Sequence, residues 1–184
     1  MLSRSLKITP AALSAVVLGL SVSTLTSAKP FADSISEAID GGDVALSLRY
    51  RYENVDQDGK PEDADASTLR SRITLKSGVA EGFMGLVEVD NVSYIGNDNF
   101  NNTENGKTNY PVVADPDYTE VNQAFISYAF DDKNKATLGR QRINHSGQRF
   151  LGGVGWRQNE QTFDAASISL APLKSLTVNY SYIW

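Results

Sequence analysis

The chain has 184 residues, a formal net charge of −5 and no cysteine. The absence of cysteine excludes a disulfide framework and a thiolate metal site, and the acidic balance argues against nucleic-acid binding. Beyond residue 28, no apolar run approaches the roughly 20 residues of a membrane helix. A membrane-spanning strand needs only about 9 to 11 residues with every second one apolar, so a membrane barrel is compatible with this composition.

Residues 1–28 are organised like a secretory signal peptide. Arg4 and Lys7 give a positive start, residues 11–25 are mostly apolar, and small residues precede a cleavage point after Ala28. A membrane-spanning helix is the weaker alternative, because the apolar segment is shorter than the roughly 20 residues that cross a bilayer. We therefore predict export. Loss of two basic residues with the signal leaves 15 basic and 22 acidic residues, a net charge of −7.

Residues 29–42 form a short lead-in on the periplasmic side. Phe31, Ile35 and Ile39 follow helical spacing before a glycine pair at 41–42. This spacing predicts one short helix or turn before the rest of the chain.

Residues 43–184 alternate between apolar and polar side chains, the period of a strand with one apolar face. The predicted strands cover residues 44–53, 69–77, 85–90, 123–128, 136–143, 166–170 and 176–184. The fifth is irregular because Leu138, Arg140 and Arg142 share one parity, which indicates a bulge near Gly139 or a different phase. The pattern predicts an all-β fold, a transmembrane antiparallel β-barrel with seven strands in this sequence.

The connections between these strands alternate in length. Those at 54–66, 96–117 and 144–162 are long and polar, and those at 78–82, 131–134 and 171–175 are short. Outer-membrane barrels have short periplasmic turns, so the long connections are predicted to face outward. A closed bacterial barrel has an even strand number, and unpaired backbone groups in hydrocarbon are costly. The odd strand number therefore predicts that residues 43–184 are the N-terminal part of a larger barrel.

Five basic residues share the inward parity of the first two strands: Arg49, Arg51, Arg70, Arg72 and Lys76. Three acidic residues, Glu53, Glu88 and Asp90, point the same way. Arginine binds carboxylates through two parallel hydrogen bonds and stays charged at any ordinary pH, so this wall is predicted to guide anionic solutes. The alternative is that the arginines pair with the inward acids and give no solute preference.

Residues 139–164 are unusually rich in Arg, Gln, Gly and aromatic side chains for an outer loop. The segment contains Arg140, Arg142, Arg149, Trp156 and Arg157. Its glycines permit tight folding, and its Arg and Trp side chains are suited to forming a constriction in the lumen. Packing on the rim for stability is the alternative, with equal weight.

No catalytic, metal or cofactor site is predicted. The Asp56-x-Asp58-Gly59 segment lacks the later acidic ligands of a calcium loop. His145 is the only histidine, and no Gly-x-Ser-x-Gly elbow supplies a nucleophile. The sequence therefore predicts a protein that is not an enzyme.

Four segments carry a family resemblance. They are Leu48-Arg49-Tyr50-Arg51-Tyr52-Glu53, Ala66-Ser67-Thr68-Leu69-Arg70-Ser71-Arg72, Thr119-Glu120-Val121-Asn122-Gln123-Ala124, and the long segment from Gly139 to Asp164. They resemble the alginate-export-domain family of outer-membrane porins. The resemblance implies a large monomeric barrel of about eighteen strands with an electropositive lumen, in the outer membrane of a Gram-negative bacterium. The implied arginine path is Arg49, Arg51, Arg70, Arg72, Arg140, Arg142, Arg149 and Arg157.

These observations predict a porin that passes anionic solutes, such as uronate oligomers or an alginate-like polysaccharide, by electrostatically guided diffusion. The expected partners are outer-membrane lipid, the barrel-assembly machinery and an anionic carbohydrate or small anionic solute, with no nucleic acid. One alternative is a small structural barrel that anchors in the outer membrane and does not conduct. Another is a secreted β-sandwich that binds carbohydrate and is soluble without detergent.

Overall fold

The computed structural model describes residues 31–184, so the predicted signal peptide lies outside the described part of the chain. One helix, α1 (Phe31–Asp40), precedes the strands, as the lead-in spacing predicted. The strands are β1 (Asp43–Val55), β2 (Ala64–Lys76), β3 (Phe83–Asn99), β4 (Thr119–Ala129), β5 (Lys135–Gln141), β6 (Phe163–Leu173) and β7 (Leu176–Ile183). A short 3₁₀ helix, η2 (Ser146–Gln148), lies between β5 and β6.

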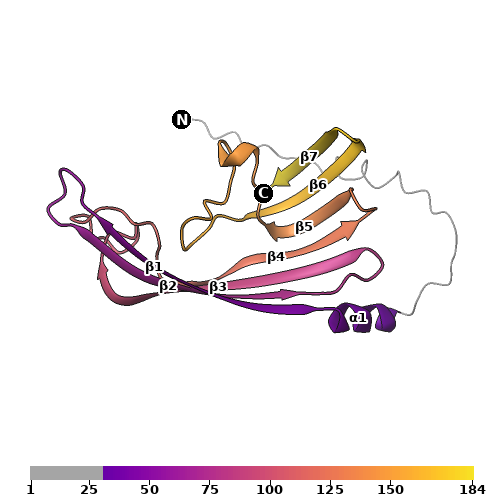
Figure 1. Ribbon diagram of the computed structural model, residues 1–184, viewed down its shortest axis with the longest axis horizontal. Coiled ribbons are helices and arrows are strands. Elements are labelled where there is room, and N and C mark those ends of the chain that lie inside the picture. Colours follow the sequence, from indigo (N-terminus) through magenta and orange to yellow (C-terminus); the bar gives the residue numbers. More distant parts are fainter. Residues whose placement is uncertain (1–30) are drawn as a thin grey trace, which may run out of the picture. The chain divides into compact units, whose positions relative to one another are not determined.

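The strands form one antiparallel sheet in chain order, from β1 to β7 (Figure 1). The register of β1 and β2 runs without interruption from Asp43 opposite Lys76 to Val55 opposite Ala64. Each strand pairs with its neighbour in the sequence, as in the wall of an up-and-down barrel. A single sheet rules out the two-sheet sandwich that the sequence left as an alternative. The fold is all-β, and the curved sheet is a section of a β-barrel.

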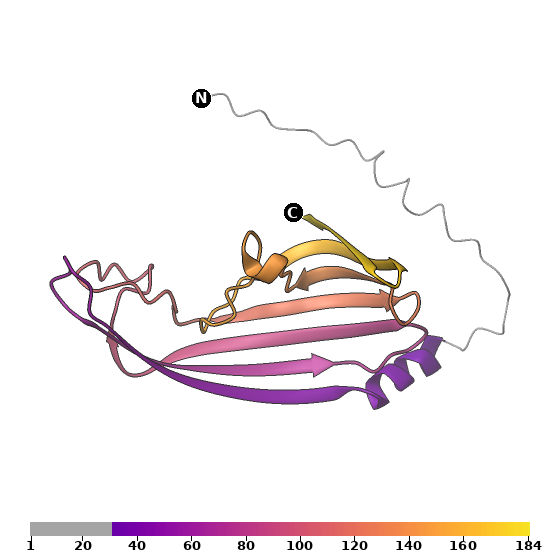
Figure 2. The ribbon, with the colours of Figure 1, turned by 45° about the horizontal axis from the view of Figure 1, so that its top comes forward.

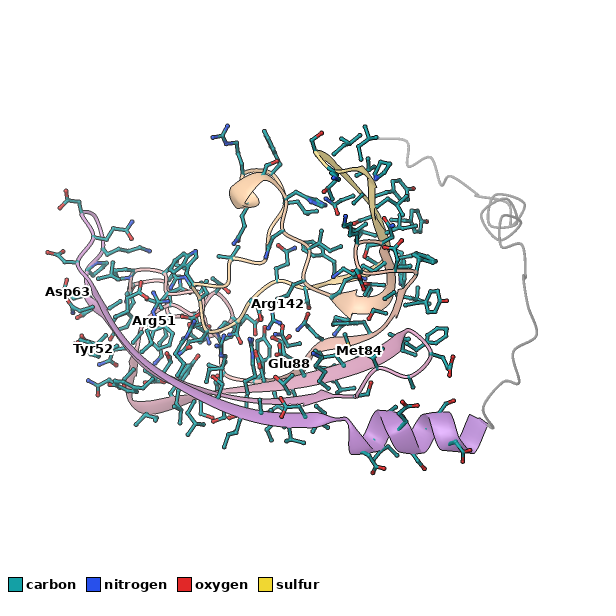
Figure 3. All side chains as sticks on the ribbon, turned by 45° about the vertical axis from the view of Figure 1, so that its right-hand side comes forward. Arg51, Tyr52, Asp63, Met84, Glu88 and Arg142 are labelled. Carbon is teal, nitrogen blue, oxygen red and sulfur yellow. The ribbon has the colours of Figure 1, made fainter. Side chains whose placement is uncertain are left out.

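The sheet has an apolar face and a charged face, because successive side chains of a strand point in opposite directions. On β1 the alternating apolar side chains from Val44 to Tyr52 are 59% to 71% exposed. Figure 3 shows Tyr52 on the convex side of the sheet, and Arg51, Glu88 and Arg142 on the concave side. The convex face is therefore the exposed apolar surface that the alternation predicted.

The pairing of β5 resolves the ambiguous phase of its sequence. This strand pairs regularly with β4 and β6, with Leu138 opposite Ile126 and Arg140 opposite Ala124. Leu138 and Arg140 therefore share the convex face. Between them, Gly139 has a φ of +121°, and a Cβ there would lie 2.3 Å from the Ala124 carbonyl oxygen. The close approach of β4 and β5 thus requires glycine at position 139.

A small hydrophobic core lies at the ends of β1 to β3 that carry the long connections and were predicted to face outward. Its buried members are Ala64, Ala66, Phe100 and Val113. Tyr94 packs edge-on against Phe100, with ring centroids 5.0 Å apart. Phe100 and Val113 belong to residues 100–118, the connection between β3 and β4, which we call the outer loop. The outer loop is therefore folded onto the sheet rather than extended from it.

Candidate pore-lining site

The concave face gathers charged side chains from three neighbouring strands. They are Arg49, Arg51 and Glu53 on β1, Arg70 and Arg72 on β2, and Glu88 and Asp90 on β3. The register places Arg49 opposite Arg70, and Arg72 opposite Asp90. Residues opposite each other in an antiparallel pair share a face, so the alternation of the sequence assigned these side chains to one surface correctly.

Arg72 is the centre of a network of ion pairs. Its guanidinium binds both oxygens of Asp90, at 2.6 and 2.5 Å, and donates to Glu160 at 2.6 Å. Arg142 contacts Glu88 and Glu160 in the same network. The side chains of Glu88 and Asp90 are only 6% and 1% exposed. Because these pairs are buried and partly bidentate, Arg72 and Arg142 are firmly engaged with carboxylates.

Glu160 receives hydrogen bonds from both charged and neutral neighbours. Asn122 donates to Glu160 at 2.6 Å and to Glu88 at 2.8 Å. Burial alone would raise the pKa of Glu160, but hydrogen bonds from Arg142 and Asn122 and the charge of Arg142 lower this pKa to about 2. Glu160 is therefore ionised at neutral pH and holds its two arginines through full charge.

The network is closed by a segment that crosses the concave face. Glu160 belongs to residues 142–162, which connect β5 and β6 and which we call the inward loop. Figure 2 shows this loop on the concave side of the sheet. Gln158 is fully buried there, and its side chain donates to Thr68 Oγ1 and accepts from Arg49 Nε, both at 2.9 Å. Of the two interpretations of this segment, these contacts support the lumenal position over packing on the rim.

Trp156 is the aromatic residue of the inward loop that contacts β1. The Arg157 guanidinium carbon lies 4.1 Å from its ring centroid, and that of Arg51 lies 5.1 Å away. Arg51 also donates to the Trp156 carbonyl at 2.7 Å, and both arginines contact Glu53. Trp156 is still 59% exposed. The site thus combines cation–π contacts with an aromatic ring that remains accessible.

Arg49 and Arg70 are bound differently from the other arginines of this face. Within residues 31–184, neither donates a hydrogen bond to a carboxylate. Arg49 donates instead to Gln158 Oε1 and to the Trp156 carbonyl, the latter at 3.2 Å. Arg70 is 7% exposed and donates to the Gln158 carbonyl at 3.4 Å. Positive charge without a directly paired carboxylate is therefore concentrated on β1 and β2.

Two arginines of the predicted path lie apart from this cluster. Arg140 is on the convex face, where it binds Asp164 through two hydrogen bonds of 2.9 and 3.0 Å. This placement differs from the predicted lumenal one, because regular pairing through Gly139 keeps Arg140 in phase with Leu138. Arg149 follows η2 at an exposed turn of the inward loop, and its side chain has no polar partner in the described part of the chain.

The concave face of β5 to β7 carries mainly neutral polar side chains. A hollow there is lined by residues that include Thr137, Ser167, Ser169, Asn179 and Ser181. Lys135 and His145 also line it, and the lining contains no carboxylate. We call this face the open sector, and the concave face of β1 to β4 under the inward loop the covered sector.

Several residues that build the site were missed by sequence reasoning. They are Asn122, Gln158 and Glu160, together with Asp115 of the outer loop. The polar density of residues 139–164 marked the inward loop but could not identify the partner of each side chain. The serines of the open sector lay on the predicted inward parity, yet nothing in their spacing indicated a hollow.

The site contains no recognisable arrangement for covalent chemistry. Among residues 31–184, no group of three or more His, Cys, Asp or Glu side chains could hold a metal ion. The same residues include no helix long and apolar enough to cross a membrane. A charged wall, an inward loop and a neutral hollow together form a surface suited to shaping the path of a solute.

The sequence matches the family Campylobacter major outer membrane protein over residues 6–155. No curated protein matches the chain significantly. The expectation of an outer-membrane porin is confirmed, but the resemblance to alginate-export-domain porins pointed to the wrong family. Alternating strands and a polar lumenal wall are common to many membrane barrels, so they do not separate one porin family from another. The chain belongs to the Campylobacter major outer membrane protein family, whose members are porins of the Gram-negative outer membrane.

Proposed function

We propose that the protein is a diffusion pore for small hydrophilic solutes and that the inward loop narrows its lumen over the covered sector. The burial of Gln158 between Arg49 and Thr68 is the observation that carries this proposal. A loop fixed on the inner wall of a barrel reduces the free cross-section and limits the size of the solutes that pass. The porin family indicates a channel rather than an enzyme.

We propose further that this pore discriminates weakly between anions and cations. Arg72, Arg142 and Arg157 each contact a carboxylate, so their charges are balanced locally. A balanced pair produces a weaker potential at a distance than a lone charge does. The covered sector would then select solutes by size and hydrogen bonding more than by charge.

A preference for anionic solutes is the second candidate, and Arg49 and Arg70 favour it. Their lack of a carboxylate hydrogen-bond partner leaves a positive surplus on β1 and β2. Small carboxylated solutes, such as uronate oligomers, are the class that this surplus would attract. Passage of a bulky alginate-like polysaccharide is less compatible with an inward loop that narrows the lumen.

Reversal potentials in planar lipid bilayers under a KCl gradient separate the two candidates. Weak discrimination predicts a reversal potential near zero for the protein and a cation-selective shift in the double variant R49Q/R70Q, which lacks two unpaired positive charges. An anion-guiding pore predicts clear anion selectivity that falls sharply in the double variant. The variant R140Q removes a positive charge from the convex face and should match the unmodified protein in either case.

Solute size is tested by the uptake of uncharged sugars into proteoliposomes. The double variant Q158A/E160A should admit larger sugars than the unmodified protein, because both side chains that seat the inward loop are shortened. Equal size limits would contradict the narrowing role of the loop. Absence of any conductance or uptake would instead support the small structural barrel.

We propose that the convex face contacts outer-membrane lipid. The chain has no cysteine, so a single introduced cysteine can carry an environment-sensitive label at one chosen site. Labels at Leu46 and Ile73, which face each other on this surface, should report acyl chains. A label at Ser47 should report water. The reverse pattern would contradict the assignment of the two faces.

A further inference from the structure

The outer loop has an internal structure that is independent of the inward loop. Phe100 and Val113 are buried in the small core at the outer ends of the strands. Asn102 is 4% exposed, and its side-chain oxygen accepts from the N–H groups of Glu104 and Asn105, at 2.8 and 2.7 Å. The outer loop is therefore a folded unit anchored on the sheet.

Asp115 of the outer loop reaches the inward loop. Its side chain is fully buried, and its Oδ1 accepts from the N–H of Gln158 at 2.8 Å. The N–H of Asn159 lies 3.5 Å from the same oxygen, and Arg157 Nη1 lies 3.7 Å from Oδ2. Asn159 in turn donates from its side chain to the Pro116 carbonyl at 2.8 Å. Three consecutive residues of the inward loop thus meet two consecutive residues of the outer loop.

These are the same residues that seat the inward loop on the sheet. The Gln158 side chain lies between β1 and β2, Arg157 contacts Glu53, and Glu160 follows directly with the central ion pairs. The backbone direction at Gln158 decides where each of these side chains points. A group that fixes this peptide therefore fixes all of them together.

We propose that Asp115 is a positioning residue for the constriction: it holds the backbone of the inward loop so that its side chains stay on the covered sector. This inference rests on the proposed pore function. A carboxylate is suited to the task because an ionised oxygen accepts from backbone N–H groups more strongly than a neutral one. Without Asp115, the buried N–H of Gln158 has no acceptor. Displacement of the inward loop toward water, where this N–H can be hydrated, then becomes more favourable.

Single-channel recordings of the protein and three variants test the proposal. D115A should raise the population of displaced-loop states roughly tenfold, as expected for one buried N–H left without a partner. The result should be a larger mean conductance and more open-channel noise. D115N keeps an oxygen at the position of Oδ1 and should restore most of the unmodified behaviour.

N102A is the matched control. It removes a buried polar side chain that caps backbone N–H groups of the outer loop but has no contact with the inward loop. It should leave conductance and noise unchanged. If D115A and N102A behave alike, Asp115 acts only through the stability of the outer loop and the proposal is overturned.

Amide hydrogen exchange gives a second measurement that does not depend on conductance. In the unmodified protein, the N–H of Gln158 should be protected as strongly as those of the paired strands. D115A should expose residues 157–159 while leaving β1 and β2 protected. Rapid exchange at Gln158 in the unmodified protein would overturn the proposal even if D115A did not assemble. Absence of channels in the unmodified protein would count against the pore function, whereas exchange would still decide the role of Asp115.

Discussion

The covered and open sectors are alike on the convex face of the sheet and differ on the concave face. Both expose alternating apolar side chains on the convex surface, at Leu46 and Tyr180 for example. On the concave surface, the covered sector holds buried ion pairs, and the open sector holds hydroxyl and amide groups around a hollow. Charges buried under a loop need partners at close range, whereas groups open to water do not. The comparison teaches that the strands supply most polar groups of the lumenal wall, and that the inward loop buries the charged ones and adds the partners Gln158 and Glu160.

The two sectors also differ in the length of their strands. β1, β2 and β3 have 13, 13 and 17 residues, β5 and β7 have only 7 and 8, and β4 and β6 both have 11. The longer strands extend beyond the shorter ones and carry the small core and the outer loop (Figure 1). They thereby provide the support on which Asp115 reaches the inward loop. The inward loop makes its buried ion pairs on the covered sector, and its first residues, Arg142 to His145, also line the hollow of the open sector.

Disruption of the pairing between β4 and β5, the seam at which the two sectors meet, should have the largest effect on folding. Gly139→Val would place Cβ 2.3 Å from the Ala124 carbonyl oxygen, at a φ of +121°. Each backbone group that loses its partner in hydrocarbon costs several kcal/mol. We expect loss of the heat-modifiable folded form on gel electrophoresis. Gly147→Ala, at a φ of +63° with open space around it, should still assemble; equal assembly of both variants would show that the seam tolerates a side chain.

Removal of a paired charge from the covered sector should have the next largest effect. Glu160→Gln leaves Arg72 and Arg142 partly uncompensated, at a cost on the order of 3 kcal/mol. The variant should unfold at lower denaturant concentration. Its reversal potential should shift toward the value of an anion-selective pore. Asp164→Asn removes the same charge from the convex face and should not change the reversal potential. A shift of equal size in both variants would contradict the assignment of the faces.

Removal of an unpaired charge from the open sector should change selectivity alone. Lys135 lines the hollow and has no polar partner for its side chain within residues 31–184. Lys135→Gln should shift the reversal potential toward the value of a cation-selective pore. The free energy of unfolding should change by less than about 0.5 kcal/mol. Lys174→Gln, in the turn between β6 and β7, is the control for a charge outside the hollow. An unchanged reversal potential for Lys135→Gln would place the solute path away from the open sector.

The response to pH should be the smallest effect, because Glu160 resists protonation. The pKa of Glu160 is lowered to about 2 from its ordinary value of 4.5. A lowered pKa means that its contribution to stability is complete above pH 4.5 and is lost as the pH falls through 2. Protonation of Glu160 should therefore not change the conductance between pH 7 and about 5. A rise in conductance within that interval, absent from Glu160→Gln, would contradict the pairing of Glu160.

Strand alternation made much of the fold predictable from the sequence. The period of two identified seven strands, and the face of Arg49, Arg51, Arg70 and Arg72 followed directly from it. Gly139 marked the one uncertain strand, but the sequence could not show whether a bulge or close packing required the glycine. Regular pairing with a positive φ was the outcome, and Arg140 therefore lies on the convex face.

The partners of the arginines were not predictable to the same degree. Arg72 meets Glu160 across 88 positions of sequence, and Arg49 meets Gln158 across 109. Such contacts depend on the path of a loop, and loops lack the periodicity that reveals strands. The family was not predictable either, because the motifs that suggested it reflect barrel physics shared by several families of porins.

The ion pair between Arg140 and Asp164 is a charged position on the convex face of the sheet, which is otherwise mainly apolar. Ionic groups are tolerated among lipid headgroups but not among acyl chains, so, if the convex face contacts lipid as proposed, we expect the membrane boundary close to this pair. Tyr52 of β1 lies on the same convex face. There the Tyr52 hydroxyl donates to Asp65 at 2.7 Å, a polar contact that belongs in water. We therefore expect the ends of β1 to β3 beyond Tyr52 and Asp65 to lie outside the hydrocarbon core of the membrane.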